Sequence, residues 1–162
     1  MARDVAWVAP DNLHLTLKFL GGVDAARLDA VATALTAAAA GSTAFDLVIR
    51  GLGAFPSPTR PRVLWAGVDE GRAEAATLAR GVDDALSGLG FEREARAFSP
   101  HVTLGRVREP RPAPQLAEAL AAAGHLGRQP VASVALMRSD LSSRGARYSE
   151  LATATLAAAA PA

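Results

Sequence analysis

The sequence predicts an α+β fold, in which strands pair antiparallel and helices pack on the outside of the sheets. Segments with strand patterns and segments with helix patterns follow one another irregularly, and the stretches between them are short. This order favours antiparallel pairing over a doubly wound parallel sheet. Of the 162 residues, 50% are apolar, which is enough to bury a hydrophobic core. No shift in composition divides the chain, so we expect one domain over residues 1–162.

The N-terminal half contains three strand patterns and two helix patterns. Apolar residues occupy every second position of residues 13–20, as they do in a half-buried strand. Within residues 24–40 they recur at helical spacing, with Asp24 suited to the N-cap and Gly41 to the C-terminal end. The glycines and prolines of residues 51–61 predict a loop. We expect strands at 13–20, 45–49 and 62–68, and helices at 24–40 and 70–86.

The C-terminal half continues the same mixture of elements. A third helix is expected at residues 114–123, where a proline begins an alanine-rich stretch. Gly88 and Gly90 precede this half and separate it from the second helix. We expect strands at 91–97, 101–107, 131–137 and 148–156.

Charge and composition narrow the classes of function. Seventeen Lys and Arg against sixteen Asp and Glu leave a net charge of +1, so no broad basic surface for a long nucleic acid is expected. The chain has no cysteine, no apolar run that could span a bilayer and no secretory pattern at its start, which predicts a cytoplasmic protein without a membrane partner. Dinucleotide and P-loop fingerprints are both missing, and we expect no cofactor.

Two of the three histidines lie in nearly the same pentapeptide. The first reads Leu-His-Leu-Thr-Leu around His14, and the second reads Pro-His-Val-Thr-Leu around His101. In a strand, residues i and i+2 face the same side about 6.6 Å apart, so each motif projects an imidazole and a hydroxyl together. Two such halves supply a base, an acid and two hydroxyl donors, the groups that attack at phosphorus requires. His125 has no threonine partner and is expected in a loop.

Other interpretations of these histidines compete with catalysis. One histidine on an apolar strand is more often a packed residue, but packing rarely requires His-x-Thr twice in the same apolar frame. Two histidines without a nearby carboxylate or cysteine form a poor metal site, so we expect no metal. A module that binds nucleotides or RNA ends without catalysis, and an RNA ligase that forms 2′-5′ linkages, remain as alternatives.

The sequence resembles the 2H phosphoesterases, and within them the RNA 2′,3′-cyclic phosphodiesterase branch once called 2′-5′ RNA ligases. The similarity rests on His14-Leu-Thr-Leu-Lys-Phe-Leu-Gly21 and Pro100-His-Val-Thr-Leu-Gly-Arg106, supported by residues 55–65 and 147–151. It implies a bilobal fold with pseudo-twofold symmetry, one motif in each lobe and a central cleft lined by the sheets. It also implies hydrolysis of RNA-terminal 2′,3′-cyclic phosphates to 2′-phosphates without a metal ion. The implied substrates are RNA ends or small cyclic nucleotides, with no obligate protein partner.

The same resemblance assigns roles to individual residues. It implies that His14 and His101 are catalytic, with His101 as base and His14 as acid. Thr16, Thr103 and Arg106 would bind the phosphate. Strict alternation puts Arg106 on the face opposite His101, so its role requires a bulge near Gly105.

Two further expectations concern the loop and the start of the chain. Arg62 is a weaker candidate for binding the phosphate than Arg106, because it could contribute only if the loop before it folds over the cleft. Members of the family usually begin with an apolar strand and a helix ahead of the first motif. Only thirteen residues precede His14, so this domain is expected to lack that strand and helix.

Overall fold

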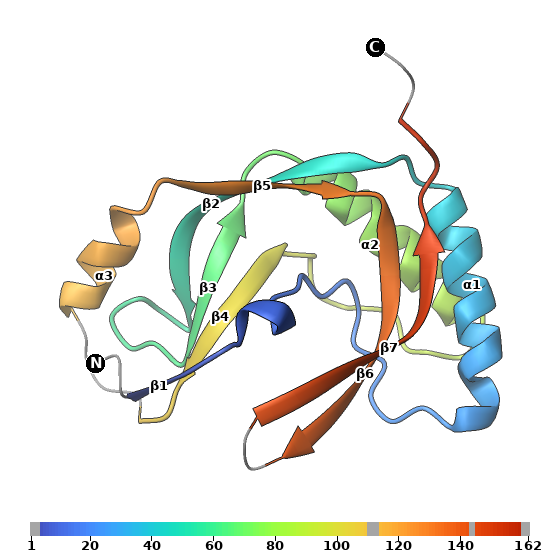
Figure 1. Cartoon of the computed structure of the whole chain (residues 1–162), viewed down its shortest axis with the longest axis horizontal. Coiled ribbons are helices and arrows are strands. Elements are labelled where there is room, and N and C mark those ends of the chain that lie inside the picture. The colour runs from blue at the N-terminus through green and yellow to red at the C-terminus, as the bar shows by residue number, and fades with distance from the viewer. Residues whose placement is uncertain (1–3, 110–113, 143–144, 160–162) are drawn as a thin grey trace. The chain divides into compact units, whose positions relative to one another are not determined.

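A computed structural model describes residues 4–109, 114–142 and 145–159 and contains strands and helices in irregular order (Figure 1). The α+β class and the antiparallel pairing predicted from the sequence are confirmed. The elements of the described residues are β1 (Val5–Trp7), α1 (Leu28–Ala40), β2 (Phe45–Phe55), β3 (Val63–Val68), α2 (Arg72–Ser87), β4 (His101–Val107), α3 (Pro114–Ala121), β5 (His125–Val131), β6 (Ser133–Ser142) and β7 (Gly145–Thr155). Short 3₁₀ turns at Pro10–Asn12 and Ala25–Arg27 complete them.

The chain divides into two compact units that are built from alternating segments. Unit 1 consists of Met1–Thr16, Leu47–Arg72 and Pro100–Gln129. Unit 2 consists of Leu17–Asp46, Ala73–Ser99 and Pro130–Ala162. Both His-x-Thr motifs therefore lie in unit 1, and the expectation of one motif in each lobe is wrong.

Unit 1 is organised around a sheet with the strand order β1-β4-β3-β2-β5 (Figure 1). Strand β4 pairs antiparallel with β1 on one side and with β3 on the other, and β3 pairs antiparallel with β2. One face of this sheet is apolar: Val5, Ala54 and Leu64 are buried together with Leu120 of α3. The opposite face is therefore available for polar side chains.

Unit 2 packs α1 and α2 against the β6–β7 hairpin. Val31 and Leu35 of α1, Leu78 of α2 and Val134 of β6 are buried in one cluster, as the helical spacing of the first two predicted. The expected helix at 24–40 is confirmed, with the Asp24 side chain accepting a hydrogen bond from the Ala26 N–H at 3.0 Å. No helix in the described part of the chain is long and apolar enough to cross a membrane.

Residues 13–20 do not form the regular strand that their alternation predicted. Only Leu15 is paired, through an isolated bridge, and the chain bends at Leu17 where it leaves unit 1. Beyond the bend the alternation no longer matches burial, because Phe19 is 84% exposed while the Lys18 side chain is only 7% exposed. A local pattern cannot reveal this bend, since it depends on contacts that residues 17–20 make elsewhere in unit 2.

Three other predictions of elements are wrong. The expected loop at 51–61 begins too early, because β2 continues to Phe55 despite its glycines. Residues 91–97 form no strand: they lie beside α2, where Asp83 accepts from the Glu94 N–H. His125 does not lie in a loop but begins strand β5.

Lys18, the only lysine of the sequence, connects the segment after the first motif to α2. Its Nζ donates to Oδ1 of Asp83 at 2.5 Å and to the Glu92 carbonyl at 2.6 Å. The hydrogen bond from Lys18 lowers the pKa of Asp83, and the Glu94 N–H acts in the same direction against the opposing effect of burial. The pair thus fixes the path of residues 17–20 along unit 2.

Replacing Asp83 by Asn should lower the free energy of unfolding by about 2 kcal/mol at neutral pH, because the nearly buried Lys18 ammonium loses its counter-ion. The folded pKa of Asp83 lies below its unfolded value, so the contribution is complete above about pH 4 and is lost as the pH falls through the folded pKa. Urea unfolding at several pH values measures both effects. Asp69→Asn, which removes an exposed pair with Arg50, is the control and should cost less than about 0.5 kcal/mol. A difference between D83N and wild type that stays constant into strong acid would contradict this account.

Candidate active site

The two His-x-Thr motifs lie side by side in unit 1. Leu15 of the first motif and Val102 of the second form an antiparallel bridge. Because the bridge is antiparallel, its register puts His14 opposite Thr103 and Thr16 opposite His101. Residues that stand directly opposite each other in such a pair point to the same face. The backbones at the two histidines, which are diagonal neighbours, are then about 7–8 Å apart. All four polar side chains share one face.

The position of the second motif follows from the centre of the sheet. His101 and Thr103 belong to β4, where they stand opposite Gly67 and Trp65 of β3. On the other edge of β4, strand β1 pairs only with residues 105–107. The first motif pairs with the same edge at Val102. The N-terminal segment thus runs along β4 twice, first as β1 and then as the first motif.

The ring of His14 is held by the backbone of the turn that precedes it. Its Nδ1 lies 2.7 Å from the carbonyl oxygen of Asn12, the last residue of a 3₁₀ turn. A carbonyl oxygen only accepts, so Nδ1 carries the proton and donates it. Nε2 is then the ring nitrogen that gains and loses a proton.

Arg106 reaches the face of the histidines through a bulge. Leu64 of β3 pairs with Gly105, but the next residue, Trp65, pairs with Thr103, so Leu104 is an extra residue in β4. This extra residue reverses the alternation and places Arg106 on the same face as Thr103. The bulge near Gly105 that the sequence required for this role is therefore present. A side chain at Gly105 would be excluded, because its Cβ would lie 2.7 Å from Cγ1 of Val5.

Two aromatic side chains beside His101 were not singled out by the sequence. Phe55 of β2 lies with its ring centroid 5.2 Å from that of His101 at an interplanar angle of 81°. Trp65 of β3 lies 6.3 Å from His101 and 5.3 Å from Phe55. The alternation within β3 places Trp65 on one face, but only the register between β3 and β4 shows that it is the face of His101.

The other sequence candidates do not join this group. Arg62 precedes β3 and is exposed, and its backbone N–H donates to the Phe55 carbonyl at 2.7 Å. His125 is exposed at the start of β5. No three side chains able to bind a metal gather at one point within the described residues.

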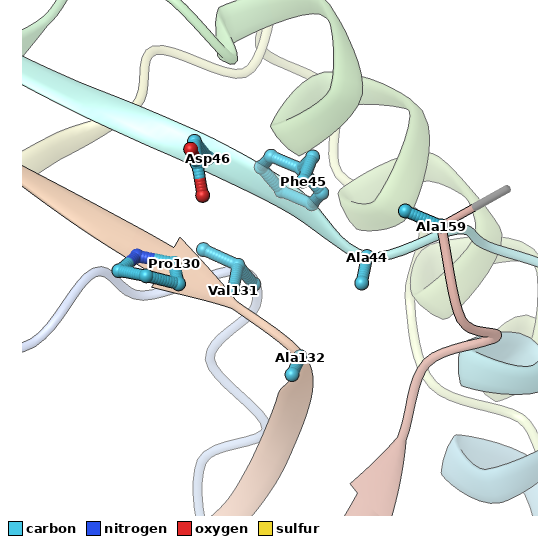
Figure 2. A pocket seen from close by; sticks show the side chains of 7 residues that line it. All are labelled: Ala44, Phe45, Asp46, Pro130, Val131, Ala132 and Ala159. Atoms are coloured by element: carbon cyan, nitrogen blue, oxygen red, sulfur yellow. The ribbon is translucent and has the colours of Figure 1, made fainter. Parts of the chain in front are cut away.

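A hollow of about 350 Å³ lies in unit 2, and its lining includes no residue of either His-x-Thr motif (Figure 2). Its lining is mainly apolar with a single carboxylate, and no histidine belongs to it. It is lined by Ala44, Phe45, Asp46, Pro130, Val131, Ala132 and Ala159. This set offers no pair of groups for proton transfer.

The histidine face combines groups suited to chemistry at a phosphate. Two imidazoles can exchange protons near neutral pH, and two threonine hydroxyls can donate to phosphoryl oxygens. The Arg106 guanidinium adds a positive charge that can pair with a phosphate. His14 and Arg106 are exposed, while Thr16, His101 and Thr103 are half-buried. A ligand could thus reach the face from solvent.

Comparisons with known proteins identify the family of the chain. The family model of the 2′-5′ RNA ligase superfamily matches residues 3–142. A protein of Methanothermobacter thermautotrophicus named RNA 2′,3′-cyclic phosphodiesterase is 37% identical over 149 residues, which are 91% of this chain and 80% of the relative. A protein of Aeropyrum pernix with the same name is 37% identical over 146 residues, 89% of this chain and 82% of the relative.

Solved structures show the same fold. TT0787 of Thermus thermophilus matches with a TM-score of 0.79 and 30% identity, over 95% of this chain and 83% of its own. LigT of E. coli, solved in complex with 3′-AMP, matches with a TM-score of 0.73 and 27% identity, over 94% of this chain and 82% of its own. The family that the two motifs predicted is confirmed by these matches.

Proposed function

Because this chain belongs to the 2′-5′ RNA ligase superfamily, we propose that it hydrolyses 2′,3′-cyclic phosphates at RNA ends to 2′-phosphates, with His14 and His101 as its catalytic pair. The observation that carries the proposal is the bridge between Leu15 and Val102, which brings both His-x-Thr motifs to one face. The names of the relatives support hydrolysis of a cyclic phosphate rather than ligation. The substrate is an RNA end or a small cyclic nucleotide.

The reaction needs one neutral and one protonated histidine. The neutral ring of His101 accepts a proton from water as the water oxygen forms a bond to phosphorus. The bond between phosphorus and O3′ breaks, and O3′ takes a proton from Nε2 of the His14 imidazolium. The phosphate stays on O2′, and each histidine ends in the protonation state in which the other began. The assignment of base and acid follows the family resemblance.

The remaining groups stabilise charge and orient the reactants. Thr16 and Thr103 each stand opposite a histidine, so their hydroxyls can donate to the non-bridging oxygens of a phosphate held between the rings. Arg106, turned to this face by the bulge, adds a charge-assisted hydrogen bond. The Asn12 carbonyl keeps the proton of His14 on Nδ1 and so directs proton transfer through Nε2. These groups account for every proton in the step, so we propose that no metal ion takes part.

The proposal is tested by incubating the purified chain with an oligoribonucleotide that ends in a 2′,3′-cyclic phosphate, in excess EDTA. We expect conversion to a 2′-phosphate end, identified by mass spectrometry and by comparison with synthetic 2′-phosphate and 3′-phosphate standards. Activity that disappears with EDTA and returns with a divalent ion would contradict the mechanism. Joining of two ends without hydrolysis would favour the ligase alternative, and binding without turnover would favour a binding module.

Replacing His14 or His101 by Ala should lower kcat by about 10²–10⁴-fold, the usual contribution of general acid–base catalysis. Thr16→Ala and Thr103→Ala should leave a larger remainder, because each removes one donor while both proton-transfer groups stay. His125→Ala is the matched control and should change kcat little. Circular dichroism checks that each variant folds. A folded H125A variant that is as inactive as H14A would show that the catalytic pair is wrongly assigned.

A further inference from the structure

The rings of Phe55, Trp65 and His101 lie together on the histidine face of unit 1. In the proposed mechanism only His101 takes part in proton transfer. Phe55 and Trp65 both contact His101, and they also contact each other. The separations of 5.2, 5.3 and 6.3 Å all fall within the range in which aromatic rings attract one another in preferred orientations. The three side chains come from three neighbouring strands, β2, β3 and β4. His101 is therefore bordered by two rings from β3 and β2, which lie on one edge of β4, while the first motif lies along its other edge.

Gly53 provides the space in which Trp65 lies. The two residues stand directly opposite each other in the pairing of β2 with β3. A Cβ at residue 53 would lie 2.2 Å from Cζ2 and 2.4 Å from Cη2 of the indole, distances that no real side chain could occupy. The indole thus covers the backbone of Gly53. Glycine in a strand often marks a position where another group comes this close. A methyl group here would push the ring away.

Packing, rather than a hydrogen bond, holds the indole in place. Nε1 of Trp65 is buried and has no hydrogen-bond partner among the described residues. Phe55, by contrast, is 40% exposed, so burial of apolar surface alone does not explain its position beside His101. What the two rings share is contact with the imidazole.

We propose that Phe55 and Trp65 are positioning residues that fix the orientation of the His101 imidazole, with Gly53 making room for the indole. The inference rests on the proposed function and extends it to residues that do not touch the phosphate. Rotation of a histidine ring about its Cβ–Cγ bond is loosely restricted by its own geometry, so neighbouring side chains must select the angle. A base in proton transfer works only if the correct nitrogen faces the water. The two rings restrict that rotation.

Three substitutions and one control test the proposal. Phe55→Leu removes a ring but keeps an apolar side chain, and Phe55→Tyr keeps the ring. Gly53→Ala displaces Trp65 without changing any ring. Gly127→Ala is the matched control, because Gly127 is also a strand glycine of unit 1 but has nothing within 4 Å of its Cβ position.

We expect F55L and G53A to lower kcat by about 10- to 100-fold, the cost of a misplaced catalytic group, while KM changes by less than about 3-fold. F55Y and G127A should keep the wild-type kcat. Kinetics are measured well below each melting temperature, so that a loss of stability alone does not lower kcat. If G53A fails to fold, F55L decides the question, since its side chain lies partly in solvent.

Proton NMR gives a readout that does not depend on turnover. The chain has only three histidines, so each ring Hε1 signal can be assigned with single variants. F55L should move the Hε1 signal of His101 and leave that of His14 unchanged. An unmoved His101 signal, or a moved signal with wild-type kcat in F55L, would overturn the inference. Wild-type protein that does not open a cyclic phosphate would instead overturn the proposed function.

Discussion

The antiparallel bridge between Leu15 and Val102 is the contact on which the candidate site depends. It joins two motifs that are far apart in the sequence, and its direction decides which residues face each other. Antiparallel pairing puts each histidine opposite the threonine of the other motif, so that neither motif alone forms a complete set of groups. A shift by one residue would turn one histidine to the opposite face. The chemistry of the site therefore rests on backbone register.

Other features of unit 1 preserve this register. Strand β4 is paired on both sides, by β3 along its length and by β1 and then the first motif on the other edge. Gly105 allows β1 to approach closely, because a Cβ there would meet Val5. The extra residue Leu104 turns Arg106 toward the histidines without disturbing the pairing of Thr103. Beyond unit 1, the ion pair of Lys18 with Asp83 fixes the chain directly after the first motif.

Local patterns predicted the parts of the fold that local interactions determine. Helices α1 and α2 follow the periodicity of their apolar residues, since one face of each is buried. The predictions fail where a contact with a residue far away in the sequence determines the local structure. Residues 51–55 contain two glycines and are expected in a loop, yet Gly53 is a strand residue that pairs with Trp65 of β3, whose indole lies over it. The repeat of His-x-Thr made the histidines and threonines candidate site residues, but the ring contacts of Phe55 and Trp65 follow only from strand pairing.

The account claims that two histidines act as a base and an acid in one step, and the pH dependence of kcat/KM tests this most directly. A pair of histidines that must hold one proton between them gives a bell-shaped profile, because the reaction stops both when the two rings are protonated and when the two rings are neutral. We predict such a bell for hydrolysis of a 2′,3′-cyclic phosphate, and the loss of one limb in His14→Ala or His101→Ala if their residual activity can be followed. A rate that rises without a maximum from about pH 5 to pH 9 would contradict a histidine acid, and with it the paired site.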